Sequence, residues 1–169
     1  LTKNTIFPSA LDIVTFSTTT SSLTAYGVSL IKDDTTFRGL SGQKFLDKIK
    51  VEFVDPLCPS LPAGVTCSTE LVEQKTFTHQ NGYSGYLTVS VLKMSSDQIS
   101  FDGAIVFGVY PDGNDVWIVA IAASNDEAQQ YTNELSTMGS SFKISNYKGE
   151  QKTQTQQSSK VAKSSVGTL

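Results

Sequence analysis

The chain has 169 residues, of which 38% are hydrophobic and 17% charged, a size and composition that suit one globular domain and exclude a highly charged disordered chain. The longest apolar run, residues 116–123, has eight residues, far short of the roughly 20 that a membrane-spanning helix needs. Residues 1–147 carry nine basic and fifteen acidic side chains. Because nucleic-acid affinity comes mostly from attraction of cations to phosphate, we expect no nucleic-acid partner.

The first part of the chain, residues 1–22, is rich in Ser and Thr but also contains apolar residues between positions 6 and 16. We expect an extended segment that docks, followed by a loop. Residues 24–31 alternate in polarity, which predicts a strand. A short helix is expected over residues 42–49, with Ser41 as its N-cap. Residues 50–54 alternate again and predict a short strand, which Asp55-Pro56 would end.

Two cysteines, Cys58 and Cys67, are separated by eight residues. Metal sites commonly use closer pairs and need four ligands, whereas this chain has no second cysteine pair and one histidine, His79. A disulfide is therefore favoured over two free thiols, and it would place the protein in an oxidising compartment. The chain starts at Leu1 rather than Met, so we expect that a leader peptide has been removed, although a start chosen for expression would look the same.

Four further strands are predicted over residues 71–79, 83–94, 103–110 and 115–123. Turn signals separate them, namely Asn81-Gly82 and the run from Pro111 to Asn114. In the strand over 83–94, apolar residues at 87, 89 and 91 alternate with residues 88, 90 and 92, so one face should be buried. The last strand is apolar on both faces and should lie at the centre of the sheet.

One long helix is predicted over about residues 124–142. Ser124 and Glu127 have the spacing of a capping box. Apolar side chains recur at intervals of three and four residues, which gives one stripe: Ala128, Tyr131, Leu135, Met138 and Phe142. A long helix over a mostly antiparallel sheet makes an α+β domain. The tail over residues 148–169 is polar and basic, with four lysines against one glutamate, and we expect it to be solvated.

No constellation of residues in the sequence points to catalysis. His79 lies beside a turn and is expected to be a surface histidine rather than a general base. The chain contains no Gly-x-Ser-x-Gly segment for a nucleophilic serine. We therefore expect no enzyme and no cofactor.

Two weaker binding candidates remain. Oxygen-bearing side chains at Asp112, Asn114 and Asp115 could hold Ca²⁺, but they lack the spacing of a calcium loop and are more typical of a hairpin turn. Tyr83, Tyr86 and Tyr110 could form an aromatic patch for a partner, although strand aromatics are also common in ordinary cores.

Residues 81–144 resemble the PsbP-like proteins. The resemblance rests on the run Gly82-Tyr-Ser-Gly-Tyr86 that opens a strand, the strands over 103–110 and 116–123, the capped helix, and the finish Ser141-Phe-Lys-Ile144. It implies an α/β/α sandwich with a central antiparallel sheet, which the Ran-binding Mog family also has, formed here by residues 23–147. Members of the PsbP-like family are mostly non-enzymatic, and the histidines that plant members use to bind metals have no match here beyond His79.

From these observations we expect a secreted or cell-surface accessory domain that docks on a protein partner or a larger envelope assembly without catalysis. One alternative is a module that binds a small ligand or Ca²⁺. Another is a self-assembling surface subunit, in which the apolar stretch over residues 6–16 pairs with the sheet edge of a neighbouring copy.

Overall fold

The computed structural model describes residues 16–17, 25–97, 100–130 and 132–149. Most of the segment predicted over residues 1–22, and the tail from residue 150 onward, lie outside the described residues. Within the described part of the chain, no helix has the length and hydropathy that crossing a bilayer requires.

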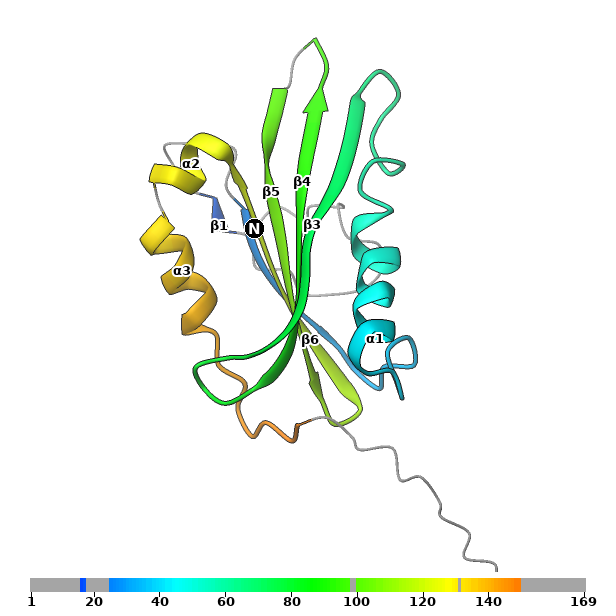
Figure 1. Ribbon diagram of the computed structural model, residues 1–169, viewed down its shortest axis with the longest axis vertical. Coiled ribbons are helices and arrows are strands. Elements are labelled where there is room, and N and C mark those ends of the chain that lie inside the picture. The colour runs from blue at the N-terminus through cyan, green and yellow to red at the C-terminus, as the bar shows by residue number, and fades with distance from the viewer. Residues whose placement is uncertain (1–15, 18–24, 98–99, 131, 150–169) are drawn as a thin grey trace, which may run out of the picture.

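A single sheet forms the middle of the molecule (Figure 1). Its strands run in the order β1-β2-β6-β5-β4-β3, and every neighbouring pair is antiparallel. The bounds are β1 Phe16–Ser17, β2 Ala25–Ile31, β3 Thr66–Thr78, β4 Ser84–Ser95, β5 Ser100–Asp112 and β6 Asp115–Ser124. The predicted antiparallel sheet is confirmed. The apolar strand β6 lies between β2 and β5, as expected of a strand buried on both faces.

Helices cover both faces of this sheet. Helix α1, Gly42–Ile49, lies on one side, and helices α2, Asn125–Gln130, and α3, Thr132–Ser141, lie on the other (Figure 1). The single long helix predicted over residues 124–142 is therefore wrong, because two short helices share that span. A three-four spacing of apolar residues fits two short helices as well as one long one, so the pattern alone does not determine the length of a helix. The Glu127, Leu135 and Met138 side chains lie outside the described residues, so the capping box and most of the stripe stay predictions.

The strand predicted over residues 50–54 is also wrong. These residues form η1, Lys50–Val54, a wider helical turn that continues α1 without a break. In a strand, Val51 and Phe53 would share a face, but here Val51 is exposed while Phe53 packs against the core. No turn signal separates Ile49 from Lys50, so the chain does not change direction there. Instead, η1 extends the apolar face of α1.

Two separate clusters fill the two sides of the sheet. The α1-side core is the larger and its rings stack face to face, as in Phe45 on Tyr86 at 4.0 Å between ring centroids. The aromatic cluster lies on the α3 side and consists of Tyr26, Tyr83, Tyr110, Val119, Phe142 and Ile144. Strand alternation assigns the residues of β4, β5 and β6 to one cluster or the other.

Strand β4 buries its more polar face. Thr88 and Ser90 are fully buried under α1, and neither hydroxyl has a hydrogen-bond partner. Leu87, Val89 and Val91, on the opposite face, are only half-buried. The cause is the placement of the helices, since α1 contacts β3 and β4 whereas α2 and α3 contact β5 and β6.

Candidate functional site

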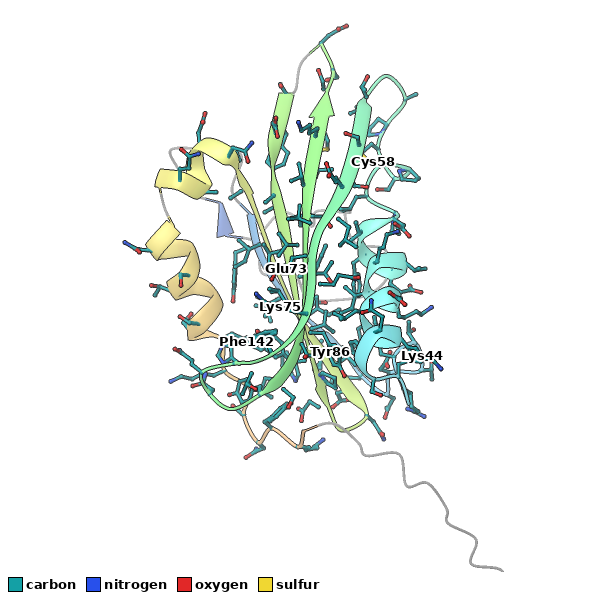
Figure 2. The ribbon with its side chains drawn as sticks, viewed as in Figure 1. Lys44, Cys58, Glu73, Lys75, Tyr86 and Phe142 are labelled. Carbon is teal, nitrogen blue, oxygen red and sulfur yellow. A yellow bond between two sulfur atoms is a disulfide. The ribbon has the colours of Figure 1, made fainter. Side chains whose placement is uncertain are left out.

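The two cysteines form the predicted disulfide. The Cys58 and Cys67 sulfur atoms are 2.08 Å apart, and their Cα atoms are 5.4 Å apart. The bond joins the loop that follows η1 to the start of β3 (Figure 2). It therefore ties the α1 layer to the edge of the sheet.

The predicted tyrosine patch is wrong, because all three rings are buried. Tyr86 stacks on Phe45 in the α1-side core, and its hydroxyl accepts a hydrogen bond from the Gly42 N–H at 3.3 Å. This bond caps α1 at the place where Ser41, which has the extended backbone of an N-cap, makes no side-chain cap. Tyr83 and Tyr110 belong to the aromatic cluster instead. Residues three apart on extended chain point to opposite faces, so Tyr83 and Tyr86 could not share one surface.

Tyr110 lies at the centre of the aromatic cluster. Its ring centroid is 5.2 Å from that of Phe142, 5.6 Å from Phe77, 5.8 Å from His79 and 6.3 Å from Tyr83. Burial, followed by the charge of the nearby Tyr26, raises the pKa of Tyr110 to about 12. Burial also raises the pKa of Tyr26. Both hydroxyls therefore stay protonated at neutral pH.

Two glycines make room for these rings. A Cβ at Gly85 would lie 2.8 Å from the Phe77 ring and 3.0 Å from the Tyr110 ring, and a Cβ at Gly108 would lie 3.2 Å from the Tyr110 hydroxyl. The Tyr110 ring thus lies across Gly108, two residues earlier on the same face of β5. Strand glycines of this kind mark a close approach, so Gly85 and Gly108 are the signal in the sequence that points to this cluster.

His79 is buried, so the prediction of a surface histidine is wrong. Its Nδ1 accepts a hydrogen bond from the Asn81 N–H at 3.1 Å, and its Nε2 lies 3.2 Å from the Gly139 carbonyl oxygen. An acceptor at Nδ1 leaves the proton on Nε2, which then donates to that carbonyl. Both ring nitrogens are therefore occupied, which leaves neither of them to take a proton from a substrate.

His79 is the first of three consecutive residues that hold the end of α3. The Gln80 amide donates to the Ser140 carbonyl at 2.5 Å, and the Asn81 amide donates to the Phe142 carbonyl at 2.9 Å. The last carbonyls of a helix have no partner within the helix. The turn between β3 and β4 thus caps α3 from a distant part of the chain, which no local sequence pattern could indicate.

The chain beyond α3 is fastened by two tyrosine hydroxyls. The Tyr83 hydroxyl accepts from the Ile144 N–H at 2.9 Å and lies 3.3 Å from the Ile144 carbonyl, to which it donates. The Tyr147 hydroxyl does the same with the N–H and carbonyl of Ser84, at 3.1 and 3.2 Å. We call residues 142–149, held in this way, the C-terminal strap.

The calcium candidate is part of the β5–β6 hairpin. An Asp112 carboxylate oxygen accepts from the Lys148 N–H in the C-terminal strap, and an Asp115 oxygen accepts from the Asp33 N–H at 3.0 Å. The Asn114 backbone carbonyl accepts from the Asp34 N–H at 2.7 Å. Among the described residues, no group of three or more His, Cys, Asp or Glu side chains could hold a metal ion. The arrangement favours the hairpin interpretation over the calcium one.

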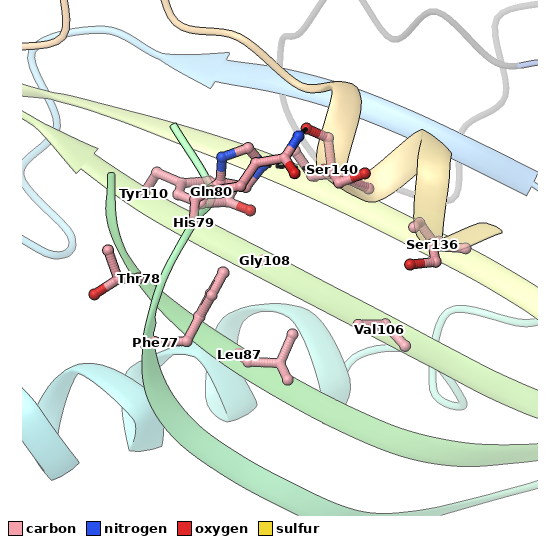
Figure 3. Close-up of a pocket in the computed structure, with 13 residues that line it drawn as sticks. Phe77, Thr78, His79, Gln80, Leu87, Val106, Gly108, Tyr110, Ser136 and Ser140 are labelled. Carbon is pink, nitrogen blue, oxygen red and sulfur yellow. Dashed lines mark hydrogen bonds between the residues drawn. The ribbon is translucent and has the colours of Figure 1, made fainter. Parts of the chain in front are cut away.

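A pocket of about 380 Å³ opens between α3 and the sheet, beside the aromatic cluster (Figure 3). Half-buried apolar side chains line it on the sheet side, and the helix contributes Ser136, Gly139 and Ser140. Tyr110, His79 and Gln80 line one end. This volume lies within the range of small-molecule sites.

The second open feature is the edge strand β3. It pairs with β4 on one side, and its other side has no strand among the described residues. Its register shifts between Leu71 and Glu73, which leaves Val72 as an extra residue in a bulge. Leu71 and Val72 are both exposed.

Comparison with known proteins gives a likeness of fold. No family model matches the chain, and no curated protein matches it in sequence. Among solved structures, PA94 from Pseudomonas aeruginosa, a protein of unknown function, matches with a TM-score of 0.54 and 9% identity, over 80% of this chain and 83% of PA94. The cyanobacterial PsbP, CyanoP, from Synechocystis matches with a TM-score of 0.52 and 8% identity, over 78% of this chain and 73% of CyanoP.

At such low identity, the two likenesses establish the architecture and carry nothing about activity. They agree with the antiparallel sheet and the helices on its two faces described above. The chain therefore has a PsbP-like fold, as its resemblance to that family over residues 81–144 predicts.

Proposed function

We propose that this protein is an extracytoplasmic, non-catalytic accessory domain that docks on a protein partner through the open edge of β3. Three large hydrophobic side chains are exposed among the described residues, and two of them, Leu71 and Val72, are neighbours on this edge. That observation carries the proposal, because exposed apolar residues beside an unpaired strand edge favour pairing with a strand of another protein.

The chemistry of the edge indicates the kind of segment that would bind. Glu70 and Glu73 flank the two apolar residues, and Glu73 is in turn paired with Lys75 at 2.8 Å. Figure 2 shows Glu73 and Lys75 along this strand. An extended segment with alternating apolar and basic side chains would satisfy both the open backbone and the acidic residues. The bulge at Val72 limits simple edge-to-edge pairing, which favours a partner shaped to this edge.

Two further observations support the other parts of the proposal. The disulfide is typical of an oxidising compartment and supports a location outside the cytoplasm. The chain has one histidine, and both of its ring nitrogens are occupied, which supports a role without acid–base catalysis. Trapping of thiols with an alkylating reagent in intact cells tests the location, since the proposal expects Cys58 and Cys67 to be protected until a reductant is added.

The docking proposal is tested with a photo-crosslinking amino acid placed at Val72 in the native cell. Val51 is the matched control, because it is also a valine and is 53% exposed, against 60% for Val72, but lies on η1. We expect the probe at position 72, and not at position 51, to form one discrete crosslinked species. Equal crosslinking at both positions, or none at either, would contradict the proposal.

The same experiment separates a foreign partner from self-assembly. If the crosslinked species contains two copies of this chain, the protein is the self-assembling subunit, with an extended segment of one copy on the β3 edge of the next. Mass spectrometry of the crosslinked peptide decides between these outcomes.

A further inference from the structure

The pocket under α3 has an apolar body. Phe77, Leu87, Val106 and Ile121 line it from four neighbouring strands, and all four are half-buried. None of the described residues that line the pocket carries a charged side chain. A charged ligand would lose its hydration in this pocket without gaining a partner of opposite charge. The described lining therefore disfavours charged ligands.

One end of the pocket presents the hydroxyl of Tyr110. Tyr110 is 4% exposed and is one of the residues that line the pocket. The hydroxyl lies above Gly108, which itself lines the pocket, and a side chain at that position would crowd it. The raised pKa of Tyr110 keeps this hydroxyl protonated, so it can donate a hydrogen bond to a ligand in the pocket.

The polar groups of His79 and Gln80, beside Tyr110, make hydrogen bonds of their own. The His79 nitrogens are occupied by Asn81 and Gly139, and the Gln80 amide nitrogen donates to Ser140. These bonds hold the end of α3 in place, so the wall that α3 forms is already in position without a ligand. A site that combines a preformed apolar cavity with one directed polar group is the common form of a small-molecule site.

We propose that this pocket binds a small uncharged ligand that has an apolar body and one hydrogen-bond acceptor, the body lying on Leu87 and Val106 and the acceptor taking the hydrogen bond of the Tyr110 hydroxyl. The proposal does not rest on docking at β3, which lies at the edge of the sheet and is tested at a different residue.

The test uses two probes of similar shape, 2-acetylnaphthalene, which has a carbonyl acceptor, and 2-ethylnaphthalene, which has none. Titrations of the full chain are followed by amide chemical shifts. We expect saturable one-to-one binding of both probes, with shifts at Val106, Gly108 and Ser136. Val106→Trp, which fills the cavity, should weaken both probes at least about tenfold, whereas Val51→Trp on the opposite side of the molecule should leave both unchanged.

Tyr110→Phe isolates the polar contact. It should weaken the acetyl probe about threefold to tenfold, the range of one neutral hydrogen bond, and leave the ethyl probe unchanged. An equal effect on both probes would show that the hydroxyl does not donate a hydrogen bond to the acceptor. Absence of saturable binding up to the solubility limit would exclude the site. Either result overturns the proposal. If Val106→Trp does not fold, the shift map on the wild-type chain decides, since shifts elsewhere contradict the assignment.

Discussion

The two faces of the sheet are held by different kinds of interaction. On the α1 side, stacked rings and aliphatic side chains pack around Phe107, and three buried hydroxyls, those of Ser29, Thr88 and Ser90, have no partner. On the α3 side, rings meet mostly edge to face, and directed hydrogen bonds from side chains to backbone fasten the helix and the C-terminal strap. The comparison teaches that a tightly packed face tolerates unpaired polar groups, while a face with a pocket is held in place by individual polar contacts.

The largest expected difference between the faces comes from removing one phenylalanine from each. Phe107→Ala, at a fully buried position, should lower the free energy of unfolding by about 3–5 kcal/mol. Phe77→Ala, at a half-buried position beside the pocket, should lower it by only about 1–2 kcal/mol. Urea unfolding of both variants measures this, and equal losses would contradict the view that the α3 side is the less tightly packed one.

Alkaline titration should weaken the α3 side. The pKa of Tyr110 is raised from 10.0 to about 12 by burial, so the folded protein holds a proton that the unfolded chain releases more readily. The contribution of protonated Tyr110 to the free energy of unfolding is fully present below pH 10. It is lost as the pH rises through 12, and the total loss is about 2–3 kcal/mol. The free energy of unfolding of Tyr110→Phe should fall less over this range than that of the wild type. Parallel curves for the two proteins would contradict the assignment to Tyr110.

A smaller effect is expected from the hydroxyl that fastens the C-terminal strap. Tyr83→Phe removes both bonds to Ile144 and leaves its buried N–H unpaired, which should cost about 1–2 kcal/mol. Tyr147→Phe, whose bonds to Ser84 are exposed, is the matched control and should cost less. Hydrogen exchange of the Ile144 amide should speed up in the first variant, and an unchanged rate would count against the strap.

The smallest expected effect has the opposite sign. Thr88→Val replaces a fully buried hydroxyl that has no partner with a methyl group of similar shape, so it should raise the free energy of unfolding by up to about 1 kcal/mol. Thr76→Val, at an exposed position of β3, should change it little. A loss of stability in Thr88→Val would reveal a partner for the hydroxyl.

The errors of the sequence-based predictions have a common physical origin. The alternation over residues 50–54 fits a strand, yet the chain continues α1 because Phe53 and Val54 reach the same core as Ile49. The three tyrosines look alike in sequence, but the faces of the strands place Tyr86 on one side and Tyr110 on the other. The polarity of β4 does not say which face is buried, because that depends on where the helices lie.

Local chemistry in the sequence determined the antiparallel strands, the turns at Asn81-Gly82 and Gly113, the helix over residues 42–49 and the Cys58–Cys67 disulfide. These features follow from side-chain periodicity, glycine conformations and the short separation of two cysteines, all of which act over a few residues. Only the tertiary structure decided the burial of His79, the capping of α3 by residues 79–81, and the pocket below Ser136. Each of these joins segments some 60 residues apart, and their meeting depends on how the helices pack on the sheet rather than on any local preference.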